Sequence, residues 1–139
     1  MAKALLYRLF GVGKVPEKIM KSMEIENIDL WEEGISGSFS AKNFKAPGKS
    51  FKYKKEFFAG WLMITRKRVL SYTLGRRQIN IMLEDPKISG LLVEILKPGV
   101  LSISYNASVY HEDWSGKIEL KYKTDKAEEF YNKLVSNMI

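Results

Sequence analysis

Residues 59–73 read AGWLMITRKRVLSYT, and this stretch decides the fold class. Residues 60–65 carry no charge and are mostly large and apolar, which is typical of a strand buried on both faces. A polar break at Arg66, Lys67 and Arg68 follows, and β-branched and aromatic residues resume after it. A helix is the rival interpretation of a short apolar run, but the break comes too soon for a typical helix. The stretch therefore predicts a β-hairpin, with Gly60 at a bend or a close backbone approach.

Similar short runs continue on both sides of this hairpin. Residues 34–44 and 51–54 alternate between apolar and polar side chains, and a Pro-Gly turn separates them at 46–48. Further strands are predicted at 77–83, 91–96, 100–105 and 117–123. The sequence thus predicts a mainly β fold, an antiparallel barrel or sandwich of about seven strands.

The clearest helix lies at the C-terminus. Apolar residues recur at helical spacing from Ala127 to Met138 and form one stripe. Asp125 is the predicted N-cap, and Glu128 completes a capping-box-like pattern. We expect this helix, residues 125–138, to close one end of the β fold.

The N-terminal third is organised differently. Residues 1–14 form an apolar arm, Pro16 is predicted to begin a short helix, and residues 25–33 are acidic and irregular. The apolar face of the short helix is expected to pack on the domain, although an arm that contacts a membrane or a partner stays open. The predicted organisation is an N-terminal arm with a helix at 1–33 and one domain at 34–139.

Composition limits the class of protein. The chain has 139 residues, 45% of them hydrophobic and 28% charged, which suits one soluble domain. Cysteine is absent, which excludes disulfides and thiolate zinc sites and fits a reducing compartment. No run approaches the ~20 apolar residues of a membrane span, and no signal-peptide pattern is present. We expect a cytoplasmic protein, with peripheral membrane association left open.

Catalytic signatures are not found. His111 is the one histidine, and with Asp113 it supplies two candidate metal ligands, too few for a site. The Gly-x-Gly-Lys at residues 11–14 departs from a phosphate loop, since its leading Gly is missing and Val15 replaces Ser or Thr. We therefore expect neither an enzyme nor a cofactor nor a metal.

Positive charge is concentrated in one segment. Residues 42–77 hold eleven of the 23 cations and one of the 16 anions, while the whole chain carries +7. If the turns at 46–48 and 66–68 lie side by side, they form one basic end. The candidate anion-binding residues are Lys42, Lys45, Lys49, Lys52, Lys54, Arg66, Lys67 and Arg68.

Residues 60–70 also resemble a known signature. They match the Gly-x-Leu-x-x-Thr-x-x-Arg-x-Leu pattern of bacterial pleckstrin-homology-like and GRAM-like domains through Gly60, Leu62, Thr65, Arg68 and Leu70. The resemblance covers roughly residues 34–138 in element order. It implies two orthogonal sheets, a C-terminal helix that closes one end, and headgroup binding near a basic end of the barrel.

Two features depart from the family pattern. The closing helix carries Phe130 and Tyr131 in place of the Trp of eukaryotic members. The first hairpin also carries only lysines where the phosphoinositide motif includes an Arg, and Lys does not form the bidentate pair that Arg forms with phosphate.

Three hypotheses follow for function. The first is a non-catalytic module that binds anionic membrane surfaces or phosphorylated headgroups at the basic end. The second is a protein-interaction or self-assembly module that uses edge strands. The third is nucleic-acid binding through the same basic patch. Phe44, Phe51 and Tyr53 lie between the lysines of this patch in sequence, and their two open roles are insertion at an interface and stacking on bases.

Overall fold

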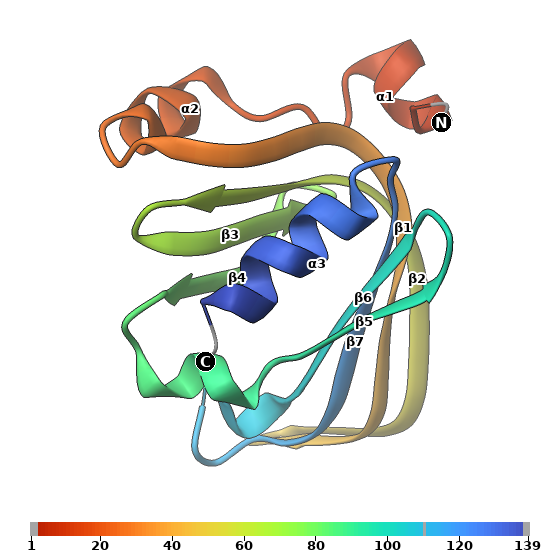
Figure 1. Ribbon diagram of the computed structural model, residues 1–139. Coiled ribbons are helices and arrows are strands. Elements are labelled where there is room, and N and C mark those ends of the chain that lie inside the picture. The colour runs from red at the N-terminus through yellow and green to blue at the C-terminus, as the bar shows by residue number, and fades with distance from the viewer. Residues whose placement is uncertain (1–2, 110, 138–139) are drawn as a thin grey trace.

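One antiparallel sheet dominates the protein. The computed structural model describes residues 3–109 and 111–137, and its seven strands lie in the order β4-β3-β2-β1-β7-β6-β5 (Figure 1). The strands are β1 Ile28–Ala46, β2 Lys49–Thr65, β3 Arg68–Thr73, β4 Arg76–Met82, β5 Leu92–Lys97, β6 Val100–Asn106 and β7 Ser115–Lys123. Three α-helices, α1 Leu5–Phe10, α2 Glu17–Glu24 and α3 Ala127–Ser136, and two 3₁₀ turns, η1 Pro86–Gly90 and η2 Ala107–Val109, complete the described chain. The sheet is not closed, because β4 and β5 form its two edges.

The hairpin predicted from residues 59–73 is confirmed. β2 ends at Thr65 and β3 begins at Arg68, so two of the three cations, Arg66 and Lys67, form the turn. All residues of β2 from Phe58 to Thr65 are buried. Gly60 lies at a close backbone approach, since a Cβ there would overlap the carbonyl oxygen of Tyr72.

Two layers cover the two faces of this hairpin. On the outer face, Trp61 and Met63 pack with Val15 of the N-terminal segment and with Met23 of α2. On the inner face, Leu62 and its neighbours join the main core. Figure 1 shows α2 and α3 on opposite sides of the sheet. The short N-terminal helix thus contacts the outer face of the hairpin, and this packing explains why the strand is apolar on both faces.

The C-terminal helix lies on the inner side of the curved sheet. Phe130 and Leu134 are fully buried in the main core, and α3 contacts β5 and β6 (Figure 1). The predicted capping residue is wrong, because α3 begins at Ala127 with Lys126 in the N-cap position. The Thr124 hydroxyl instead accepts a hydrogen bond from the backbone N–H of Lys126, at 3.0 Å. Met138 lies outside the described residues.

Several element bounds also differ from the predictions. β1 begins at Ile28, so residues 28–33 are strand rather than irregular, and the expected domain boundary at 34 falls inside β1. Residues 49–65 form one continuous strand where two were predicted. The N-terminal arm contains α1, which was not predicted because its six residues are too few for a periodic signal.

Candidate functional site

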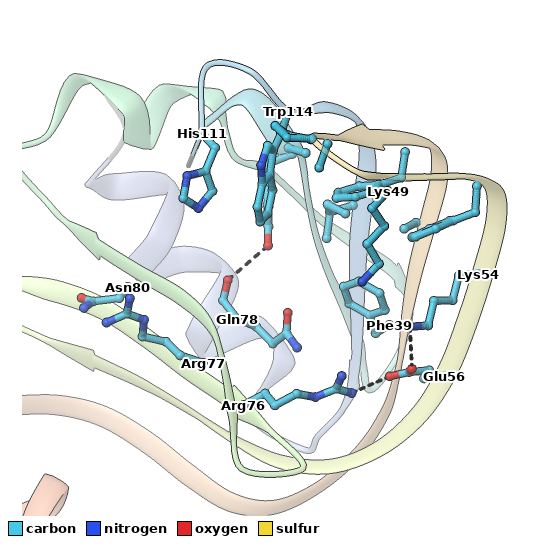
Figure 2. Close-up of a pocket in the computed structure, with 18 residues that line it drawn as sticks. Phe39, Lys49, Lys54, Glu56, Arg76, Arg77, Gln78, Asn80, His111 and Trp114 are labelled. Carbon is cyan, nitrogen blue, oxygen red and sulfur yellow. Dashed lines mark hydrogen bonds and ion pairs between the residues drawn. The ribbon is translucent and has the colours of Figure 1, made fainter.

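A cavity of about 650 Å³ lies between the β1–β2 hairpin and β4 (Figure 2). We call it the mouth cavity. Aromatic rings form much of its wall: Phe44 and Phe51 stack with ring centroids 4.9 Å apart, and Trp114 meets Phe44 edge-on at 5.6 Å. The size and the apolar wall are typical of small-ligand sites. The full lining comprises Phe39, Ala41, Phe44, Ala46, Pro47, Lys49, Phe51, Lys54, Glu56, Arg76, Arg77, Gln78, Asn80, Tyr105, Ala107, His111, Trp114 and Ile118.

Four cations and one carboxylate line the same cavity. Lys49 and Lys54 come from β2, and Arg76 and Arg77 from β4. Figure 2 shows Arg77 on the opposite side of the cavity from the two lysines. Cations from two strands that are not neighbours in the sheet therefore line one cavity.

Glu56 is the carboxylate, and it links the two sides. Its Oε2 lies 2.6 Å from Arg76 NH2, and its Oε1 lies 3.1 Å from Lys54 Nζ. Figure 2 shows Arg76 and Lys54 reaching Glu56 from different sides. The hydrogen bond from Arg76, followed by the one from Lys54, lowers the pKa of Glu56 below its ordinary value. The Glu56 carboxylate thus pairs with two of the four cations, and the cavity keeps a net positive charge.

The β1–β2 end holds part of the predicted anion-binding set. Lys49 and Lys54 line the mouth cavity. Lys42, Lys45 and Lys52 are exposed on the same hairpin but do not line the cavity.

The β2–β3 end holds the other predicted residues, and here the expected clustering is wrong. Arg66 and Lys67 are exposed in the turn after Thr65, at the far end of the strand that Lys49 begins (Figure 1). The clustering required the chain to fold back within residues 49–65. Because β2 is one continuous strand of 17 residues, its two turns lie at its opposite ends.

Arg68 has a structural partner. Its Nε and NH2 atoms donate to the two carboxylate oxygens of Glu26, at 2.9 and 2.7 Å. The hydroxyl of Thr65 donates to Glu26 at 2.9 Å and accepts from the backbone N–H of Arg68 at 3.0 Å. The Thr and Arg of the motif therefore fasten the segment after α2 to the β2–β3 turn.

Sequence reasoning missed several residues of the cavity. Arg76 and Arg77 were counted in the basic segment but not placed in the site, although the arginine pair after Gly75 was a usable signal. Trp114 belongs to a loop with no periodic pattern, and nothing in the sequence indicated it. His111 lies beside Trp114, with ring centroids 4.0 Å apart. Within residues 3–109 and 111–137, no group of three or more His, Cys, Asp or Glu side chains could hold a metal ion.

The comparisons with known proteins add no identification. No model of a protein family matches this chain, and neither a curated protein nor a solved structure matches it significantly. They therefore do not identify a pleckstrin-homology-like or GRAM-like domain. As for the membrane, the described part of the chain contains no helix with the length and apolarity that a bilayer crossing requires.

Proposed function

We propose that this chain is a non-catalytic binding module of the pleckstrin-homology-like group. In this proposal the sheet curls into the barrel or sandwich of that group and α3 closes one end. Three features support it: seven antiparallel strands, a C-terminal helix packed on the inner face, and the motif at residues 60–70 in a β-hairpin. The ligand is an anionic membrane surface or a phosphorylated headgroup.

The mouth cavity is the observation that carries this proposal. Its aromatic wall accommodates the apolar part of an amphiphile, and its cations attract the anionic part. Lys49 and Arg77 have no ion-pair partner among residues 3–109 and 111–137, so both are available to a phosphate. Each cation near an anionic surface contributes ~1 kcal/mol. Binding is therefore expected to be weak and sensitive to salt, because the Debye length shortens to ~8 Å at physiological ionic strength.

Vesicle co-sedimentation tests this proposal. Vesicles that contain phosphatidylserine or a phosphorylated inositol lipid are expected to retain the protein at low salt and to release it as salt rises. The double variant K49E/R77E is expected to lose this binding.

The double variant R66E/K67E is the matched control, because it reverses the same number of charges on exposed side chains at the far end of β2. It is expected to bind as the parent does. Equal binding by the parent and by K49E/R77E would overturn the assignment of the mouth cavity.

A further inference from the structure

The outer face of β2, β1, β7 and β6 is a second basic surface, distinct from the mouth cavity. Strand register places side chains of this face in rows, because directly paired residues point to the same side. One row joins Phe57 and Ser38 to Lys121 and Ser102, and the next joins Lys55 and Ser40 to Glu119 and Ser104. The following row joins Tyr53, Lys42, Lys117 and Asn106. On the other side of the first row, Lys123 pairs with Ser36.

A groove of about 360 Å³ lies on this face. Ser36, Gly37 and Ser38 of β1 belong to its lining. Four lysines from three separate parts of the sheet also line it, and no carboxylate does: Lys55, Lys97, Lys121 and Lys123. We call this the lysine groove. Its charge and its hydroxyl groups complement a phosphodiester chain.

Acidic residues on this face leave most of the lysine charge uncompensated. Glu119 lies next to the groove, 3.8 Å from Lys121 Nζ, and accepts a hydrogen bond from Ser102 at 3.0 Å. Glu94 of β5 pairs with Ser102 in register. Lys55, Lys97 and Lys123 have no ion-pair partner in the part of the chain that the structure describes.

Two exposed aromatic residues accompany the lysines. Phe57, at the groove, is 76% exposed, and Lys55 Nζ lies 5.2 Å from its ring centroid. Tyr53 is 56% exposed and lies four residues earlier on the same strand and face, ~13 Å along it. Leaving these rings in water forgoes the free energy that their burial would release. An exposed pair of rings on a basic face suits a partner whose bases can stack on them.

We propose that the lysine groove and its aromatic flank bind single-stranded nucleic acid. Phe57 and Tyr53 stack on bases, while the lysines contact the phosphates. A concave groove favours this ligand over a flat bilayer, because a flexible strand can enter it and hydrogen-bond the half-buried Ser36 in its lining. The site is independent of the proposed function, since Lys54 lines the mouth cavity while its neighbour Lys55 lines the lysine groove.

Fluorescence anisotropy with labelled oligothymidylate and oligouridylate, across a salt series, tests the proposal. We expect the parent to bind, and log affinity to fall as log salt rises, by about 0.7 for each phosphate neutralised. Phe57→Ala is expected to weaken binding about tenfold through lost stacking, whereas Phe57→Trp retains it. The double variant K121Q/K123Q is expected to weaken binding and to flatten the salt slope.

Control variants separate this site from the mouth cavity and from general charge effects. Lys133→Gln removes an exposed cation of α3 and is expected to leave oligonucleotide affinity nearly unchanged. K49E/R77E is also expected to keep most of that affinity, so failure of one site does not imply failure of the other. No oligonucleotide binding at low salt, equal binding by the parent and Phe57→Ala, or vesicle binding that depends on Phe57 without oligonucleotide binding would each overturn the proposal.

Discussion

The hydroxyl oxygens of Ser71 in β3 and Tyr122 in β7 lie 2.8 Å apart in the buried core. Ser71 uses its one hydroxyl hydrogen to donate to the backbone oxygen of Trp61, at 2.8 Å, so Tyr122 is the donor in the pair. Strands β3 and β7 are separated by β2 and β1, a distance of ~14 Å across a flat sheet. Direct contact between their side chains therefore requires the strong curvature that also creates the hollow for α3.

Replacing Tyr122 by Phe tests this contact. Because the variant removes one buried hydrogen bond and keeps the ring, we expect a loss of about 1 kcal/mol in the free energy of unfolding, measured by urea denaturation. Tyr53→Phe is the matched control, since that hydroxyl is on an exposed side chain, and it should leave stability unchanged. Equal stability of Tyr122→Phe and the parent would show that the contact does not hold the sheet in its curve.

A larger loss of stability is expected when the packing of α3 is disturbed. Phe130 is fully buried, so Phe130→Ala is expected to cost about 3–5 kcal/mol in urea melts. Asn132→Ala, on the exposed face of the same helix, is expected to cost little. A loss below ~1 kcal/mol for Phe130→Ala would contradict the role of α3 in the core.

Arg68 is expected to act on the N-terminal segment rather than on a ligand. Removing a charged hydrogen-bond partner of Glu26 should destabilise the protein by roughly 2 kcal/mol in Arg68→Ala. Hydrogen exchange should increase first in α2 and in the β2–β3 turn. Arg66→Ala, in the same turn but exposed, should show neither effect, and a similar response from both variants would contradict the assignment.

The ion pairs of Glu56 are expected to show in its pKa and in the pH dependence of stability. Because the hydrogen bond from Arg76 depresses the pKa of the folded-state carboxyl, its contribution to stability is present above the unfolded pKa of ~4.3. That contribution is lost as pH falls through the lower, folded pKa. Arg76→Gln is expected to raise the pKa, measured by NMR titration of the carboxyl carbon, and to reduce the acid-dependent loss of stability. An unchanged pKa in Arg76→Gln would contradict the pairing.

Local patterns predicted much of the fold. Alternation and turn residues indicated the strands from 60–65 onward, because each of those strands has a buried face and a polar boundary. They did not predict the start of β1, whose first residues include Asp29, Glu32 and Glu33, residues that rarely favour strands. The Glu33 carboxylate is stabilised in this strand by a hydrogen bond from the hydroxyl of Tyr7 in α1, at 2.7 Å. This contact joins distant parts of the chain, so the local sequence does not reveal it.

The candidate site was less predictable than the fold. Charge density along the chain grouped Lys49 with Lys67, but a long strand separates them. Lys121 and Lys123 were not among the predicted site residues, because acidic residues nearby in sequence lower the local net charge. Their outward face was nevertheless predictable, since they alternate with the buried Ile118, Leu120 and Tyr122. Sequence reasoning fixes which face a residue takes more readily than which distant strand lies beside it.

Isothermal titration of a short-chain, water-soluble anionic phospholipid into the parent and into Glu56→Gln tests the central claim most directly. Glu56 competes with the ligand for Lys54 and Arg76, so its neutral isostere should free both cations and tighten binding. Each cation that becomes free to contact the anionic ligand is expected to contribute ~1 kcal/mol to the binding free energy. That contribution corresponds to about a fivefold increase in affinity per cation. Tighter binding by Glu56→Gln, together with loss of binding in K49E/R77E, is the result that the account predicts. Weaker or unchanged binding by Glu56→Gln would contradict it.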